Sequence, residues 1–127
     1  DDGKEVTFQF FCEGQAVSSI ESFKGNQKSL FTIESIEPCT ILTITKKDFQ
    51  SILDSSPSIA KIVEENIFQR LLYYQHLFLS RIKDNPQKRY EELIKNQPEI
   101  LQRVPQHYIA SYLGITPVSL SRIRNRR

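Results

Sequence analysis

Residues 104–124 read Val-Pro-Gln-His-Tyr-Ile-Ala-Ser-Tyr-Leu-Gly-Ile-Thr-Pro-Val-Ser-Leu-Ser-Arg-Ile-Arg and predict two short helices around a tight turn. Pro105 opens the first helix, because proline is tolerated where no backbone N–H partner is needed. Gly114 ends it, since glycine readily takes the left-handed conformation that terminates a helix. Thr116 is placed to cap the second helix and Pro117 to begin it. The stretch therefore predicts a helix-turn-helix.

Apolar residues at helical spacing explain why the two helices should cross and pack. A small side chain, Ala110, sits where the second helix must approach the first closely. The core-facing positions are Ile109, Ala110 and Leu113 in the first helix, Ile115 in the turn, and Leu120 and Ile123 in the second helix.

The opposite face of the second helix carries Val118, Ser121, Arg122 and Asn125. An arginine can pair with guanine O6 and N7 in the major groove, and an apolar side chain can contact a thymine methyl group. These residues therefore predict binding to double-stranded DNA. The alternative is a three-helix packing unit with a solvated basic tail.

Charge is unevenly distributed along the chain. The total is +2, from 17 basic and 15 acidic residues, and all the acids precede residue 100. All the charged residues from residue 100 onward are therefore basic, which favours a polyanionic partner. Its basic residues are Arg103, Arg122, Arg124, Arg126 and Arg127.

Length and composition limit the remaining possibilities. The 127 residues suffice for one domain or two small ones. No apolar run approaches the roughly 20 residues of a membrane span, so a cytoplasmic protein is expected. Cys12 and Cys39 favour free thiols over a disulfide, and no metal site or cofactor is expected. His76 and His107 are isolated from any nucleophile, so we expect no enzymatic activity.

Strand-like patterns occupy the N-terminal part of the chain. Lys4–Phe11 alternates apolar and polar residues after a hairpin-turn signal at Asp1-Asp2-Gly3, and Leu30–Ile36 and Thr40–Thr45 are further expected strands. A hairpin turn at residue 1 lacks its first strand, so upstream strands of a barrel are expected to be missing. Short helices are expected at residues 18–23 and 47–53.

A long helix is predicted from Ser58 to about Lys83, followed by another over Pro86–Asn96. Two apolar stripes run along the long helix, which suggests that one packs within the chain and the other pairs with a second copy. The alternative is a buried core helix within a monomer. The expected dimer residues are Ile67, Leu71, Tyr74 and Phe78.

Together these segments resemble the Crp/Fnr transcription regulators, whose founding member is the cyclic-AMP receptor protein. The similar segments are residues 43–49, Ser56-Pro57 with the long helix, and residues 104–124, which read like the versions in Bacteroides-like bacteria. The resemblance implies an α+β fold with a cyclic-nucleotide-binding-type β-roll, a homodimer and a palindromic DNA site. It implies a partial β-roll in residues 1–55, a dimerisation helix in 56–84 and a helix-turn-helix head in 85–127.

The resemblance also assigns roles to individual residues. RNA polymerase and an unidentified small-molecule effector are implied partners. Gln106 and Thr116 would contact phosphates, as would the basic residues from Arg124 to Arg127. Base-edge contacts would come from Val118, Ser119 and Arg122, with Arg122 in the place of the guanine-reading arginine.

The effector loop departs from the family pattern. Gly14-Gln15 and Lys28-Ser29 stand where the family has Gly-Glu and Arg-Ser or Arg-Thr, which argues against cyclic AMP as the effector. Arg70 and Tyr74 fall near the positions that contact the base in other members, although packing roles fit them as well. A different hypothesis is a small-molecule-sensing module whose helical head mediates protein contacts.

Overall fold

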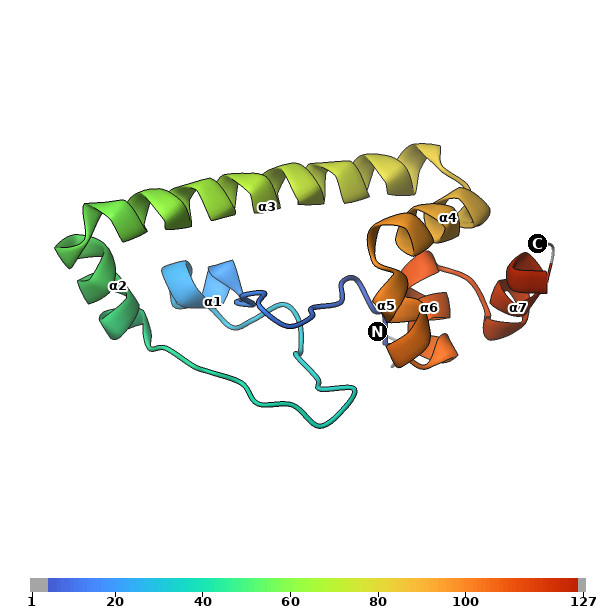
Figure 1. Cartoon of the computed structure of the whole chain (residues 1–127), viewed down its shortest axis with the longest axis horizontal. Coiled ribbons are helices and arrows are strands. Elements are labelled where there is room, and N and C mark those ends of the chain that lie inside the picture. Colours follow the sequence, from blue (N-terminus) through green and yellow to red (C-terminus); the bar gives the residue numbers. More distant parts are fainter. Residues whose placement is uncertain (1–4, 126–127) are drawn as a thin grey trace. The chain divides into compact units, whose positions relative to one another are not determined.

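The computed structural model describes residues 5–125, which form helices joined by turns and extended segments (Figure 1). These residues divide into two compact units, one made of residues 5–15 and 78–125 and the other of residues 16–77. We call the first unit the head unit and its residues 5–15 the N-terminal strap. The helices are α1 (Ile20–Gly25), α2 (Lys46–Ser55), α3 (Pro57–Lys83), α4 (Pro86–Asn96), α5 (Pro98–Arg103), α6 (Gln106–Leu113) and α7 (Pro117–Asn125).

The predicted α+β fold is wrong, because no residue between 5 and 125 lies in a β-strand. Residues 30–36 and 40–45 are irregular despite their strand-like sequence, and the cyclic-nucleotide-binding-like β-roll is not formed by the described residues. A strand is stable only when a neighbouring strand receives its hydrogen bonds and its apolar face is covered. Side chains such as Ile41 and Leu42 are instead exposed.

The N-terminal strap also differs from the strand expected there. Phe10 is buried in the core of the head unit, and the backbone N–H of Thr7 donates to Ser111 Oγ in α6 at 2.9 Å. The alternating sequence of this segment thus reflects packing on helices rather than pairing in a sheet.

The helices agree better with the sequence patterns. α1 begins two residues after the expected start at residue 18, because Ser19 is its N-cap and accepts from the N–H of Ser22. α2 includes the expected residues 47–53, with Thr45 as N-cap accepting from Asp48 N–H at 3.1 Å. The 27-residue α3 confirms the predicted long helix.

Proline and asparagine mark the helix boundaries in the head unit. Asn85 caps α4 by accepting the N–H of Lys88 at 2.9 Å, and Pro86 is in its first turn. α5 also begins with a proline, Pro98, but no side chain caps its first turn. The buried side chains that join these helices are Phe10, Tyr90, Leu93, Ile100, Ile109, Ala110, Leu113 and Leu120.

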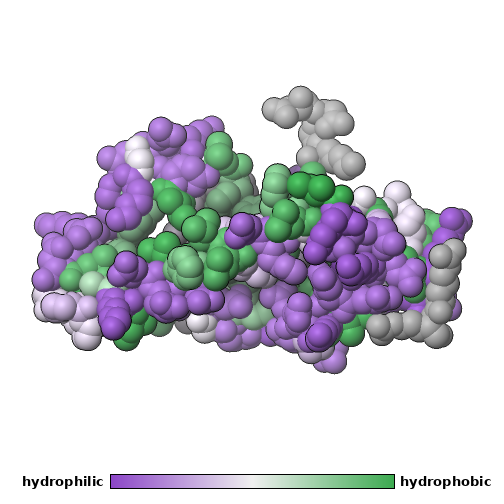
Figure 2. All heavy atoms as spheres, turned by 90° about the horizontal axis from the view of Figure 1, so that it is seen from above, coloured by the Kyte–Doolittle hydropathy of each residue, from purple (hydrophilic) through white to green (hydrophobic). Residues whose placement is uncertain are grey.

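None of the helices within residues 5–125 combines the length and the apolar character required to cross a membrane. Much of the apolar surface is nevertheless exposed, and Figure 2 shows hydrophobic side chains lying openly beside polar ones on the face it draws. Along α3 this exposed set includes Ile67, Leu71 and Phe78.

Candidate nucleic-acid interface

Helices α6 and α7 meet at a tight turn centred on Gly114. Gly114 has a φ of 71°, in the left-handed region that favours glycine, and its N–H donates to Ser111 O at 3.0 Å. The N–H of Ile115 donates to Ala110 O at 3.0 Å, which closes the end of α6. The predicted stop at Gly114 is confirmed, whereas the predicted helical start at Pro105 is one residue early, because Pro105 is the N-cap.

The start of α7 is fixed by Thr116. Its Oγ1 accepts the N–H of Ser119 at 3.2 Å, and its hydroxyl donates to Ser119 Oγ at 3.1 Å. The helix begins at Pro117, as predicted. Thr116 is exposed, while Ser119 is half-buried on the flank of the helix.

The inner faces of α6 and α7 are packed as the apolar spacing predicted. Ile109, Ala110 and Leu113 of α6 are buried, and Leu120 of α7 is 0% exposed. Ile123 packs against the same cluster. This burial fixes the rotation of α7 about its axis and thereby decides which of its side chains face outward.

The outward face of α7 carries the predicted base-reading residues. Val118 is 62% exposed, and Ser121, Arg122 and Asn125 are exposed as well. An apolar side chain, a small hydroxyl, a guanidinium and an amide therefore share one helix face. These groups match the methyl, acceptor and donor pattern of the major groove.

The N-terminus of α6 offers a second type of contact. No side chain caps this end, and Gln106, its first residue, is exposed. The first N–H groups of a helix have no partner within it and lie at the positive end of its dipole. Such an end suits a phosphate group.

The basic residues of the head unit are not equivalent. Arg122 and Arg124 are exposed, while Arg126 and Arg127 lie outside the described residues. Arg103 donates from Nη2 and Nη1 to Glu13 Oε1 and Oε2 at 2.6 and 2.9 Å. The hydrogen bond from Arg103 lowers the pKa of Glu13 to about 2. One basic residue of the segment from residue 100 onward thus has an acidic partner from the strap.

Two arginines donate hydrogen bonds to the last turn of α6. Arg81 of α3 donates to Tyr112 O at 2.6 Å, and Arg89 of α4 donates to Leu113 O at 2.5 Å. These carbonyls belong to the last turn of α6, where cationic donors are favourable. Burial, followed by the nearby charge of Arg81, lowers the pKa of Arg89.

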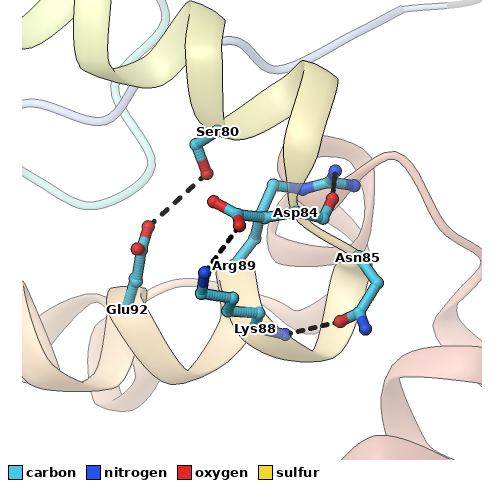
Figure 3. Close-up of polar contacts among 6 residues, drawn as sticks. All are labelled: Ser80, Asp84, Asn85, Lys88, Arg89 and Glu92. Carbon is cyan, nitrogen blue, oxygen red and sulfur yellow. Dashed lines mark hydrogen bonds and ion pairs between the residues drawn. The ribbon is translucent and has the colours of Figure 1, made fainter.

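The junction between α3 and α4 supports Arg89 (Figure 3). Arg89 Nη1 donates to the carbonyl of Asp84 at 2.9 Å, and Lys88 Nζ lies 2.7 Å from Asp84 Oδ1. The hydrogen bond from Lys88 lowers the pKa of Asp84, and the same bond raises the pKa of Lys88. Ser80 Oγ donates to Glu92 Oε2 at 3.5 Å. The end of α3 is therefore fixed to α4, whose Arg89 in turn donates to the last turn of α6.

Sequence reasoning missed this support. Phe10, Glu13, Arg81 and Arg89 all act on α5 or α6 from elsewhere in the chain, and no local pattern marks them. The sequence features that could have pointed to them are arginines near the end of a predicted helix and an aromatic residue in an alternating segment. Neither feature identifies the residue that each side chain contacts.

The candidate effector residues belong to different units. Gly14 and Gln15 are in the head unit, where Gln15 Oε1 accepts the N–H of Cys12 at 2.9 Å. In the other unit, Ser29 Oγ donates to Phe31 O at 2.7 Å, so this hydroxyl serves a local turn. Lys28 is exposed there, and no disulfide joins Cys12 and Cys39. The remaining candidates, Arg70 and Tyr74, are half-buried on α3.

The predicted dimer stripe lies along α3. Leu71 is 62% exposed, and Ile67 and Phe78 are exposed to a similar degree, while Tyr74 is half-buried with its ring 6.0 Å from that of Tyr73. No group of three or more metal-binding side chains occurs among residues 5–125.

Comparison with known proteins gives no family for this chain, since no family model, curated protein or solved structure matches it significantly.

Proposed function

We propose that this chain is a sequence-specific, DNA-binding transcription regulator that reads its site with α7. The observation that carries the proposal is the division of α7 into a buried face containing Leu120 and an outward face containing Val118 and Arg122. The outward face takes no part in the packing that fixes the helix-turn-helix. Such a division is expected of a helix that enters the major groove.

The dimensions of α7 suit this role. An α-helix with its side chains is about 10–12 Å in diameter, which fits the roughly 12 Å width of the major groove, and the nine residues of α7 give it a length of about 13.5 Å. Arg122 would pair with a guanine and Val118 would contact a thymine methyl group. Gln106 and Thr116 would contact phosphates near the N-termini of α6 and α7. The resemblance of residues 104–124 to Crp/Fnr regulators supports the same assignment.

We further propose that the protein acts as a homodimer through α3. The exposed stripe of Ile67, Leu71 and Phe78 has the alternating spacing of a helical seam, and contact with a second copy would remove it from water. Two heads related by a two-fold axis would read half-sites about 34 Å apart. RNA polymerase and a small-molecule effector other than cyclic AMP remain the proposed further partners, and the cytoplasm the proposed location.

The ligand-sensing hypothesis loses its main support. It required a cyclic-nucleotide-binding β-roll, and the residues described here form no strand. We therefore do not retain it as a second function.

A matched pair of substitutions on α7 tests the DNA-reading role. Cognate sites are first selected from a randomised duplex pool, with paired half-sites expected about 10 bp apart. Arg122→Ala should cost about 1–3 kcal/mol on the selected site and relax the preference at one base pair. Arg124→Ala should weaken binding to selected and random duplexes equally, because it removes only a phosphate contact. Equal losses on both duplexes for Arg122→Ala would contradict base reading by this residue.

Leu71→Lys tests the dimer. A lysine in the stripe would place two like charges at the two-fold contact, so the variant should be monomeric by light scattering at concentrations where the unaltered chain is dimeric. The control Lys61→Leu changes an exposed residue of the same helix outside the stripe and should stay dimeric. A dimer that persists in Leu71→Lys would exclude this seam.

A further inference from the structure

The N-terminal strap delivers a carboxylate to a basic residue of the head unit. Both terminal nitrogens of Arg103 donate to the two carboxylate oxygens of Glu13, at 2.6 and 2.9 Å. This two-pronged pairing is also the geometry in which arginine holds a phosphate. Glu13 therefore occupies the donors that Arg103 would offer to a DNA backbone.

The position of Arg103 gives this pairing its importance. Arg103 is the last residue of α5 and lies three residues before Gln106, where α6 begins. That end of α6 has no side-chain cap, so its first N–H groups and the positive end of its dipole already favour an anion. Without Glu13, that carboxylate would no longer neutralise the positive charge of Arg103 beside them.

The strap is held by contacts other than the ion pair. Phe10 is 7% exposed in the core, and its ring lies 5.4 Å from the ring of Tyr112. The N–H of Thr7 donates to Ser111 Oγ at 2.9 Å. Packing therefore keeps Glu13 near Arg103, and losing the ion pair alone would leave the strap in place.

The ion pair itself is open to solvent. The side chain of Glu13 is 75% exposed and that of Arg103 is 37% exposed. Exposed ion pairs hold their members weakly, because water and salt screen the attraction. Loss of the Glu13 charge can therefore open Arg103 to a phosphate at this edge without disturbing the core.

We propose that Glu13 competes with the DNA backbone for Arg103, so that the strap lowers the affinity of the head unit for DNA. The inference rests on the proposed function, since it assigns a regulatory contact to the same DNA-binding surface. Any event that lifts the strap from α5 would raise phosphate binding without changing the base-reading face of α7.

A salt titration with single substitutions tests the competition. The probe is a fluorescent random-sequence duplex, and the protein is the full 127-residue chain. Glu13→Gln keeps the shape of the side chain and removes its charge. One additional phosphate contact should steepen the salt dependence by about 0.9, so the gain in affinity should shrink about 3.5-fold between about 50 and about 200 mM salt.

Two controls isolate Arg103 from general charge effects. Glu5→Gln removes the same charge from an exposed residue of the same strap and should leave the salt slope unchanged. In an Arg103→Gln background, Glu13→Gln should also leave the slope unchanged, because the contested guanidinium is gone. Equal gains from Glu5→Gln, or a gain that persists without Arg103, would overturn the proposal.

The outcome also separates this inference from the proposed function. DNA binding that depends on Arg122 but is insensitive to Glu13→Gln would overturn the competition alone. Absence of binding by every variant at about 50 mM salt would overturn both proposals. Steeper salt dependence that requires both Arg103 and the lost charge of Glu13 would support them together.

Discussion

Leu120 and Val118 lie two residues apart on α7. Substituting Leu120 by alanine should lower the stability of the head unit, whereas substituting Val118 should change only its DNA binding. Leu120 is 0% exposed within the buried cluster, whereas Val118 is 62% exposed. Leu120→Ala leaves a cavity between α6 and α7, and substitutions of this type cost about 2–5 kcal/mol. Full burial places Leu120 near the middle of that range, at about 3 kcal/mol.

Val118→Ala should change stability by no more than about 0.5 kcal/mol, because exposed substitutions rarely do more. Alanine also has the higher helix propensity, which offsets any lost contact. Its effect should appear in DNA binding instead, as a weaker preference for thymine at one position of the selected site.

Amide hydrogen exchange in peptides covering α6 and α4 is the appropriate assay, because it reports on the head unit separately from residues 16–77. A loss of about 3 kcal/mol corresponds to exchange roughly a hundredfold faster in Leu120→Ala. Val118→Ala should exchange at the unaltered rate. Equal protection in both variants, or a larger loss in Val118→Ala, would refute the orientation of α7 on which the proposed DNA contact depends.

Two further predictions concern the turn and the strap. Gly114→Ala should destabilise the head unit by about 1–2 kcal/mol through backbone strain alone, since Gly114 has φ 71° and the nearest atom to an added Cβ is Arg89 Nη2 at 3.9 Å. Gly114→Asn should cost less in the same hydrogen-exchange assay, because asparagine tolerates the left-handed conformation better. Equal losses in the two variants would point to a steric cause instead. Because the pKa of Glu13 is lowered from 4.5 to about 2, its ion pair should stabilise the strap fully above about pH 4.5 and be lost as the pH falls towards 2. NMR titration of the Glu13 carboxyl should give a midpoint below 4.5 that returns towards 4.5 in Arg103→Gln, and an unchanged midpoint would assign the shift to another group.

Local signals predicted the helical part of the fold well. The turn at Gly114, the cap at Thr116 and the long α3 follow from interactions between residues a few positions apart, which the sequence displays directly. The outward face of α7 was predictable for the same reason, because its buried face is set by helical periodicity.

The predicted strands failed because strand formation is not a local property. Residues 30–36 and 40–45 have β-branched, alternating sequences, yet a strand requires a partner to complete its hydrogen bonds. The strand predicted for the N-terminal segment failed for a related reason. Its alternating sequence places Phe10 in the helical core of the head unit, so an apolar side chain is buried without a sheet.

The sequence by itself therefore determined the helix-turn-helix and the face of α7 that it presents. Only the tertiary structure decided what surrounds the motif. Glu13 reaches Arg103 across 90 positions, and Arg89 reaches the carbonyl of Leu113 across 24. Periodicity and capping act within a few residues along the chain, whereas contacts over such separations depend on how the folded segments pack.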